Sequence, residues 1–311
     1  MNLEQLRAFA TVAELGNFTR AAEQLHLAQP SLSRQIAALE QDLGVELVTR
    51  ARAGSTLTPA GESLLPLARR MLADAASVRR ELDALAGLRR GRVRLGATPT
   101  LCVSLVTEVL SEFHEAHPAI ELHITERGSR GLLEALGGGE LDLALITTSG
   151  AASTEKFTVT PLLVEELVVV SSGDAAPLTD RESLRLAEVA GLPQVVFSST
   201  YDLRATTDAA FRAAGLSPRT VIEGAEMDAV LRFVERGLGV AIVPAMVLID
   251  RPGLRAVRLE APTLERTISL ARPADVAATA AVDVMQRTIA DTATAFAARA
   301  GETMRLASAQ P

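Results

Sequence analysis

Apolar positions recur at helical spacing along the first 60 residues, which predicts three short helices. The first starts near Leu3 and ends at Gly16. The second follows Thr19, whose side chain we expect to cap it. Gln29-Pro30 opens the third, because proline suits the first helical position, and Gly44 ends it. The third helix is expected to bury one face, formed by Leu32, Ile36, Leu39 and Leu43.

From Ala60 the pattern changes to one long helix with apolar residues spaced alternately by four and three. Such a seam, sustained over about three heptads, is typical of a coiled coil and favours pairing with a second chain. The alternative is a long helix packed on its own domain. Gly87 and Arg89-Arg90-Gly91 are expected to end the helix and form a linker. The seam residues are Leu64, Ala68, Met71, Ala75, Val78, Leu82 and Leu85.

Beyond residue 92, short apolar runs alternate with helical patterns, which predicts two α/β halves and a parallel sheet. A last alanine-rich helix follows, and residues 302–311 are expected to form a flexible tail. The expected strands are 93–96, 120–125, 141–147, 164–171, 194–198, 220–222, 240–244 and 268–271. The expected helices are 100–117, 129–136, 206–214, 227–236 and one that contains 282–296.

The charge distribution separates these regions. The chain of 311 residues has a net charge of -7, but residues 1–91 carry 11 Arg against 10 acidic residues. The remaining residues carry 20 basic and 28 acidic side chains, a net of -8. We therefore expect an acidic unit that stays off DNA, joined to an N-terminal region that is able to bind it.

Several classes of protein are disfavoured by the same sequence. No apolar run is long enough for a membrane span, and no secretory signal is visible, so we expect no membrane partner and a cytoplasmic location. The single cysteine, Cys102, excludes an internal disulfide and a cysteine metal cluster. The four histidines show no zinc spacing, and no nucleophile–base pair or nucleotide loop is evident. We therefore expect no metal, no cofactor and no enzyme activity.

Two short helices joined by a tight turn allow the second helix to lie in the major groove of double-stranded DNA. The start of the third predicted helix offers small and polar groups, among which Arg pairs with guanine, Gln pairs with adenine, and Ser holds phosphate. An ordinary solvated helix face is the alternative. The candidate DNA contacts are Thr19, Arg20, Gln29, Pro30, Ser31, Ser33, Arg34 and Gln35, with Arg50 and Arg52 in the following loop.

The same stretch resembles the signature of LysR-type transcriptional regulators. Its matching segments are Phe18 to Leu25, Gln29 to Ile36, Leu39-Glu40, Leu43-Gly44, Leu47 to Arg50 and Leu57-Thr58-Pro59-Ala60-Gly61. Later segments agree, namely Gly139 to Ala144 and Gly237 to Pro244. The resemblance covers essentially the whole chain.

This resemblance implies a winged helix-turn-helix at 1–59, a linker and dimerisation helix at 60–91, and a two-lobed α/β effector domain at 92–301. The effector domain would resemble periplasmic binding proteins, with lobe I at 92–163 and 269–301 and lobe II at 164–268. The family usually forms dimers of dimers that bind promoter DNA, respond to a small effector and contact RNA polymerase.

Ligands of α/β sheets bind where strands end and helices begin. The hydroxyl-rich strand ends of both halves therefore predict an effector cleft, and free backbone N–H groups near Thr100 would suit a carboxylate or another small anion. Helix capping is the alternative role for each hydroxyl. Val164 and Glu165 with Thr267 and Ile268 are the expected lobe crossovers. The candidate effector contacts are Thr98, Pro99, Thr100, Thr147, Thr148, Ser198, Ser199, Thr200 and Arg204.

Two further readings remain open. Cys102 lies near the predicted cleft and would allow a redox-responsive regulator, although a lone cysteine on an apolar helix usually serves packing. A small-molecule binding protein whose N-terminal helices contact proteins is the other. Steep weakening of DNA binding with rising salt would discriminate against the latter.

Overall fold

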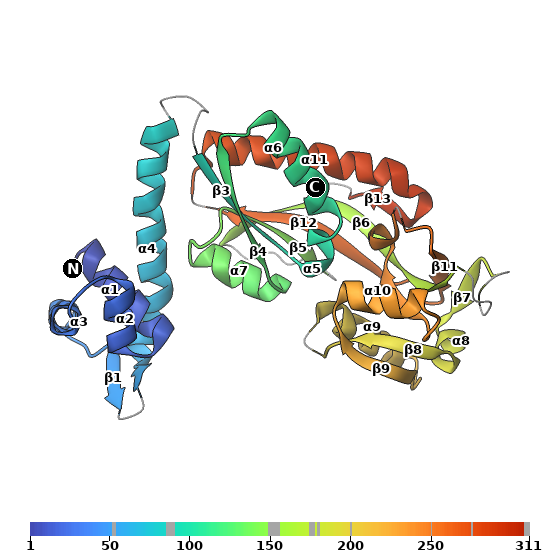
Figure 1. Cartoon of the computed structure of the whole chain (residues 1–311), viewed down its shortest axis with the longest axis horizontal. Helices are drawn as coiled ribbons and strands as arrows, with labels where there is room; N and C mark the ends of the chain where they lie inside the picture. Colours follow the sequence, from blue (N-terminus) through green and yellow to red (C-terminus); the bar gives the residue numbers. More distant parts are fainter. Residues whose placement is uncertain are drawn as a thin grey trace. The chain divides into compact units, whose positions relative to one another are not determined.

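The computed structural model describes residues 1–51, 54–84, 91–148, 156–173, 178, 181–199, 201–249, 251–274 and 276–307. It contains two compact units, residues 1–91 with 134–142 and residues 92–133 with 143–311 (Figure 1). Of the predicted contacts, Arg52 and Thr200 lie outside the described residues, and so does Leu85 of the seam. The side chains of Arg50 and Leu82 also lie outside them.

The N-terminal unit contains the three predicted helices, followed by a two-stranded wing and a long helix. Leu6, Phe9, Leu32, Ile36 and Leu39 form its buried core. Leu43, expected on the same face, is exposed. The elements are α1 (Leu3–Leu15), α2 (Phe18–Gln24), α3 (Gln29–Leu43), β1 (Val48–Ala51), β2 (Gly54–Leu57) and α4 (Pro59–Ala84).

Helix ends follow the sequence signals with one exception. Gly16 and Gly44 end α1 and α3 in the left-handed conformation, with φ of 58° and 71°. The expected cap of α2 at Thr19 is wrong, because the Asn17 side chain accepts the N–H groups of Thr19 and Arg20 at 2.9 and 3.1 Å. Asn17 therefore holds the first turn, and Thr19 lies within the helix.

Two glycines allow the wing to lie close to the helices. A Cβ on Gly54 would lie 2.6 Å from the carbonyl oxygen of Gly16, next to a Ser55 N–H bond to that same oxygen at 2.7 Å. A Cβ on Gly61 would lie 2.2 Å from the carbonyl oxygen of Leu47. Both positions therefore exclude larger residues unless the backbone moves.

The seam of α4 divides into two parts. Leu64, Ala68 and Met71 pack against the N-terminal core, as the own-domain alternative required. Val78, further along the seam, is 56% exposed. Leu67, which does not belong to the seam, is 54% exposed. The heptad pattern thus combines positions used inside the unit with positions that remain uncovered.

The second unit has two lobes joined through one mixed sheet, with strand order β4-β3-β5-β12-β6-β11-β7 among the described residues. The predicted parallel pairing is confirmed for β3 with β5 and for β8 with β9, whereas β12 and β6 are antiparallel. In lobe I, α6 and α11 lie side by side on the sheet (Figure 1). The lobe I elements are β3 (Gly91–Ala97), α5 (Pro99–Cys102), α6 (Leu105–Ala116), β4 (Ile120–Glu126), α7 (Ser129–Gly137), β5 (Leu143–Thr148) and α11 (Ala280–Ala300).

Most of lobe II is formed by residues that lie, in the sequence, between the two long strands that connect the lobes. Its smaller sheet, β8 with β9, lies against α9 and α10. The predicted elements at 194–198, 206–214, 220–222, 227–236 and 240–244 are confirmed with shifted ends. The lobe II elements are β7 (Ser183–Arg185), α8 (Leu186–Gly191), β8 (Pro193–Phe197), α9 (Asp202–Ala213), β9 (Arg219–Ala225), α10 (Met227–Glu235), β10 (Ala241–Pro244), the 3-10 helix η1 (Ala245–Leu248) and β11 (Leu254–Glu260).

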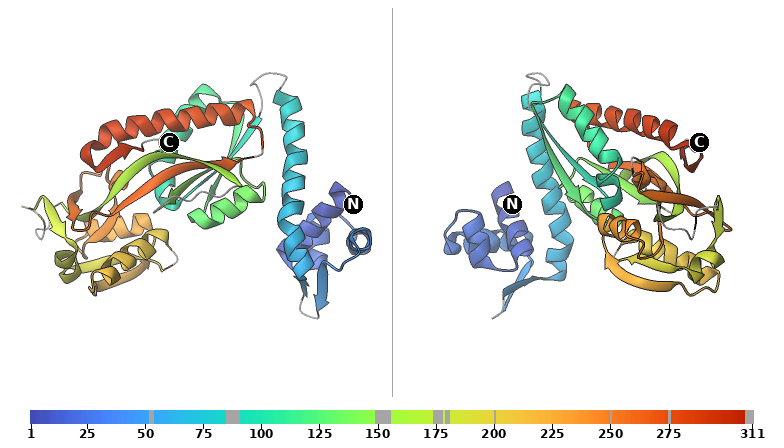
Figure 2. Two further views of the ribbon diagram at one scale, coloured as in Figure 1. Left: turned by 180° about the vertical axis from the view of Figure 1, so that it is seen from behind. Right: turned by 45° about the vertical axis from the view of Figure 1, so that its right-hand side comes forward.

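Two long strands, β6 (Phe157–Ser172) and β12 (Glu265–Pro273), run side by side from lobe to lobe (Figure 2). Val164 pairs with Thr267 and Leu163 with Ile268, so the two expected crossovers are adjacent. The expected strands at 164–171 and 268–271 were too short. β6 alternates exposed and half-buried residues in its first half and is continuously buried in its second, which hid its full length.

Two other expectations were wrong in the second unit. The single helix at 100–117 is broken into α5 and α6 at Ser104, whose hydroxyl donates to the carbonyl of Thr100 at 2.7 Å. The tail expected from residue 302 is ordered through residue 307, because η2 (Gly301–Thr303) leads into β13 (Met304–Leu306). β13 pairs antiparallel with residues 163–165 of β6, while residues 308–311 lie outside the described residues.

Candidate DNA-binding face and effector cleft

The polar start of α3 lies on the surface of the N-terminal unit. Arg34 and Pro30 are exposed, and Gln29, Ser31, Ser33 and Gln35 are half-buried. Gln29 donates to the Ser33 hydroxyl at 2.9 Å, and Arg34 donates to Ser31 at 3.2 Å. These side chains hold one another in place yet keep donors available to a partner, because each amide or guanidinium carries further N–H groups.

Other predicted DNA contacts lie on neighbouring elements. Thr19 and Arg20 are exposed in the first turn of α2. Arg50 lies in the first wing strand, where its backbone pairs with Ser55. The antiparallel hairpin of β1 and β2 supplies the wing that the sequence resemblance implied.

Segments from both lobes meet at one cavity of about 240 Å³. Lobe I contributes Thr98, Pro99, Thr100, Glu126, Gly128 and Thr147, and lobe II contributes Tyr201, Asp202, Leu203, Glu226 and Arg266. A cavity of this size suits a small organic molecule. Four predicted contacts, Thr98, Pro99, Thr100 and Thr147, are brought together here.

Two buried hydroxyls in the cavity wall, those of Thr98 and Tyr201, lack a hydrogen-bond partner within the described residues. Nη2 of Arg266, in the same wall, is ion-paired with Glu165 at 2.5 Å. A buried orphan of this kind costs about 1–3 kcal/mol. Because native proteins satisfy nearly all such groups, two orphaned hydroxyls on one cavity indicate a site that a bound molecule or ordered water completes.

Arg266 lies on β12, at the point where this strand passes between the two lobes. It is 7% exposed and its Nε donates at 2.6 Å to Glu165, which is fully buried on β6. The other oxygen of Glu165 accepts the Met246 N–H at 3.2 Å, and Nη1 of Arg266 lies 3.4 Å from the Thr100 hydroxyl. This chain of contacts joins the cavity wall to β6 and to η1 of lobe II.

The remaining predicted effector contacts lie off the cavity. Arg204, the expected counter-charge, is committed to Asp208 at 2.7 Å and to the carbonyl of Phe197 at 2.9 Å. Thr148 pairs with Thr267 in the sheet, Ser199 is exposed, and the Ser198 carbonyl accepts the Tyr201 N–H. None of these four residues lines the cavity.

Sequence reasoning missed Arg266, Tyr201 and the carboxylates of the lining. Tyr201 directly follows the predicted hydroxyl cluster, and it is the only tyrosine of the chain. Its ring stacks on Phe197 with centroids 4.9 Å apart, and burial raises its pKa, partly offset by Thr100 and Arg266. Arg266 directly precedes the predicted crossover at Thr267. An arginine next to a crossover strand was therefore the available signal.

Asp202 connects the two lobes directly. Its carboxylate, at the start of α9, accepts the N–H of Ser129 at the start of α7 at 3.1 Å. A carboxylate at a helix N-terminus is favoured by the exposed N–H groups and by the helix dipole. The protein's own side chain thus occupies the position where the start of α7 would otherwise attract an anion.

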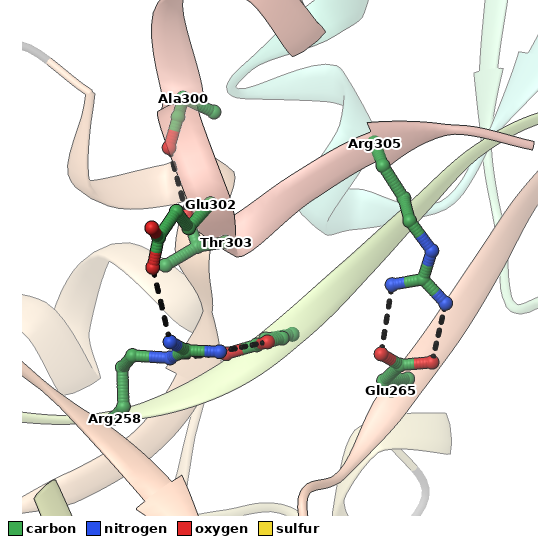
Figure 3. Close-up of polar contacts among 7 residues, drawn as sticks. Arg258, Glu265, Ala300, Glu302, Thr303 and Arg305 are labelled. Atoms are coloured by element: carbon green, nitrogen blue, oxygen red, sulfur yellow. Dashed lines mark hydrogen bonds and ion pairs between the residues drawn. The ribbon is translucent and has the colours of Figure 1, made fainter.

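The C-terminal segment from Gly301 to Leu306 reinforces the crossover, as Figure 3 shows, and is called here the strap. Arg305 on β13 donates to both oxygens of Glu265 on β12, at 2.8 and 2.9 Å. Arg258 on β11 binds Glu166 through two hydrogen bonds at 2.6 and 3.0 Å, and Glu302 at 3.3 Å. The strap therefore links strands on both sides of β6.

Cys102 lies at the end of α5, half-buried beside the cleft. Burial, together with the nearby Glu126 carboxylate, raises the pKa of its thiol to about 12. Because the thiolate is the reactive form, this environment disfavours a redox role at neutral pH. The chain holds no second cysteine for an internal disulfide.

No helix in the described part of the chain is long and apolar enough to cross a membrane. No group of three or more His, Cys, Asp or Glu side chains among the same residues is arranged to hold a metal ion.

The helix-turn-helix with its wing and the two-lobed cleft define a class of protein, a DNA-binding transcriptional regulator with an effector-binding domain. Residues 3–62 match the family model of the bacterial regulatory helix-turn-helix protein, lysR family, and residues 86–294 match the LysR substrate binding domain. The chain belongs to the LysR family of transcriptional regulators, which confirms the resemblance seen in its sequence.

Similar curated proteins share this description. The uncharacterized HTH-type transcriptional regulator YybE of Bacillus subtilis (strain 168) is 34% identical over 271 residues, covering 87% of this chain and 92% of that protein. A probable nitrogen assimilation transcriptional activator of Synechococcus elongatus is 32% identical over 88% of this chain and 89% of its own. A probable hydrogen peroxide-inducible genes activator of Streptomyces viridosporus is 33% identical, over 87% of each.

Solved structures agree on the architecture. A full-length variant of OxyR from Pseudomonas aeruginosa superposes with a TM-score of 0.72 at 25% identity, covering 100% of this chain and 99% of that chain. Full-length CbnR complexed with its target DNA has a TM-score of 0.65 at 24% identity and covers 96% and 100%. The winged helix-turn-helix, long helix and two-lobed domain of the expected fold are thereby confirmed.

Proposed function

We propose that this regulator binds an imperfect palindrome in promoter DNA as a dimer of dimers, controlled by a small molecule in the cleft. The half-sites would be read by α3, with Gln29, Ser33 and Arg34 as the principal base contacts. Two-fold symmetry of the paired chains sets the half-site spacing. The observation that carries the proposal is the exposed polar start of α3, whose Arg34 is free of acidic partners among the described residues.

Pairing through α4 is supported by its exposed apolar residues. Val78 lies on the heptad seam, beyond the part that packs on the N-terminal core. An uncovered apolar residue continuing a heptad seam favours association with a second helix. A paired chain also supplies the second reading helix that a palindromic site requires.

The effector would act by changing the relation of the lobes. A molecule that fills the cavity contacts both lobes, so it stabilises the arrangement in which they are close and shifts the population toward it. Such a shift would be transmitted as altered DNA bending or altered contact with RNA polymerase. The orphaned Thr98 and Tyr201 hydroxyls support a ligand at this position.

The test is a gel-shift series with the full chain and the promoter region of a divergently transcribed neighbouring gene. Binding should require two half-sites in phase and weaken steeply with salt, because phosphate contacts release counterions. Binding that is insensitive to salt or to half-site spacing would overturn the proposal. Size measurement of the same complex distinguishes a dimer from a dimer of dimers.

A further inference from the structure

The lining of the cleft carries more negative than positive charge, the opposite of what an anionic effector alone requires. Glu126, Asp202 and Glu226 face a single guanidinium, that of Arg266. Arg266 is itself neutralised by the buried Glu165. A simple anion would therefore enter a cavity of unfavourable potential.

The carboxylates differ in what they already bind. Asp202 is engaged with the start of α7 through the Ser129 N–H. Glu126, at the end of β4, and Glu226, directly before α10, have no basic partner within the described part of the chain. Both line the cavity and are exposed, so solvent-borne cations can reach them. Two uncompensated carboxylates, one from each lobe, remain available to a cation.

The buried wall of the cavity, in contrast, favours a negatively charged group. Thr98 is 4% exposed, and its hydroxyl has no hydrogen-bond partner within the described residues. The Tyr201 hydroxyl is unpartnered in the same sense, and the guanidinium of Arg266 lies in the same wall, ion-paired with Glu165. Hydroxyls and a guanidinium donate to acceptor oxygens, and a carboxylate is the acceptor that suits a planar guanidinium best.

We infer that the effector is a small zwitterion of the amino-acid class, with its carboxylate toward Thr98, Tyr201 and Arg266 and its ammonium group between Glu126 and Glu226. This inference rests on the proposed function, because it takes the cleft to be the effector site. The volume of about 240 Å³ admits a molecule of that size.

The same arrangement explains why binding would move the lobes. Glu126 belongs to lobe I and Glu226 to lobe II, so without a cation their like charges oppose closure. An ammonium group between them replaces repulsion with two attractions. The positive end of the ligand would thus act as the closing element, while its carboxylate satisfies the buried donors.

The experiment measures thermal stabilisation of the full-length protein by the twenty proteinogenic amino acids. Each stabilising amino acid is then compared with the carboxylic acid and the amine of the same skeleton, such as 4-methylpentanoate and isoamylamine for leucine. At least one amino acid should stabilise the protein, and removing either charged group should weaken its binding about tenfold or more, the worth of one charge-assisted hydrogen bond.

Variants assign the two ends. Glu126→Gln and Glu226→Gln should each weaken amino-acid binding about tenfold and leave binding of the matched carboxylic acid unchanged or stronger. Glu121→Gln and Glu223→Gln are the controls, because each lies on the same or the adjoining strand outside the cavity. Equal effects of all four variants would overturn the placement of the ammonium group.

The remaining outcomes separate the two proposals. Stabilisation by acids or amines alone would overturn the zwitterion and leave the cleft as an effector site. No stabilisation by any probe would also overturn it, and promoter binding measured on the same sample would then show independently whether the DNA function stands.

Discussion

The polar side chains of the candidate DNA-binding face and of the effector cleft differ in solvent exposure and in hydrogen bonding. On α3, Gln29 and Arg34 are solvated and steadied by neighbouring serines. In the cleft, the Thr98 hydroxyl is buried without a hydrogen-bond partner among the described residues, and Arg266 is buried against Glu165. A surface for DNA keeps its polar groups solvated until its partner arrives, whereas the cavity wall holds buried groups that a bound molecule or ordered water must satisfy. Substitutions should therefore alter binding at the first region and also stability at the second.

The largest effect is expected from Glu165→Gln in the wall of the cleft. It leaves the buried Arg266 without its counter-charge, which typically lowers the free energy of unfolding by about 3–5 kcal/mol. Urea denaturation of the effector domain in the full chain measures this. Glu265→Gln, which breaks an exposed pair with Arg305, is the matched control and should cost less than about 1 kcal/mol. Equal losses would remove the contrast between buried and exposed pairs.

The second expectation concerns Arg34→Ala on α3. Loss of a bidentate base contact should cost about 1–3 kcal/mol of specific DNA binding and relax preference at one base pair, with stability unchanged. Gel shifts against single-base operator variants measure both. Arg232→Ala, an exposed arginine of α10, is the control and should leave binding intact. An unaltered base preference in the Arg34 variant would show that another residue reads that position.

A smaller effect is expected from Asn17→Ala. It removes the side chain that caps α2 and should lower the stability of the N-terminal unit by about 1 kcal/mol, whereas Thr19→Ala should change it less. Thermal denaturation followed by circular dichroism compares the two. A larger loss of stability in the Thr19 variant would show that Thr19 caps α2, as the sequence indicated.

The smallest effect is expected at the strap and depends on pH. Arg305 lowers the pKa of Glu265, so this pair stabilises the folded state above the ordinary pKa of glutamate. The stabilisation is lost as pH falls through the lowered value. Arg305→Gln should therefore cost up to about 1 kcal/mol at pH 7, and this cost should shrink as the pH is lowered through the depressed pKa of Glu265. A cost that persists in acid would point to packing by the arginine stem instead.

The two regions also differ in how far their sequences reveal them. Helix ends at Gly16, Pro30 and Gly44 are local signals, so the helix-turn-helix could be predicted nearly residue by residue. Only the α2 cap was misplaced, because Asn17 and Thr19 are both good capping residues two positions apart. The proposed base contacts Gln29, Ser33 and Arg34 lie within six residues of one helix, so their grouping could be predicted without a structure.

The cleft could be predicted only in part. Strand-end hydroxyls placed Thr98, Thr100 and Thr147 on it, since these follow the general rule for α/β sheets. Arg266 was not predicted as a cleft residue, because its partner Glu165 lies 101 residues away in the sequence. Arg204 attracted attention by its proximity in sequence, but Asp208 one turn further on satisfies it locally.

The strap has a practical consequence for dissecting this protein. The matched LysR substrate binding domain ends at residue 294, before β13 begins. A fragment cut at that boundary would lack one of the two strands that flank β6 at residues 163–165. Its lobes would be joined by a less supported crossover, and its ligand response would differ from that of the intact chain. Fragments should extend to residue 307, and a fluorescent label attached there would lie beside the crossover between the lobes and would be sensitive to changes at it.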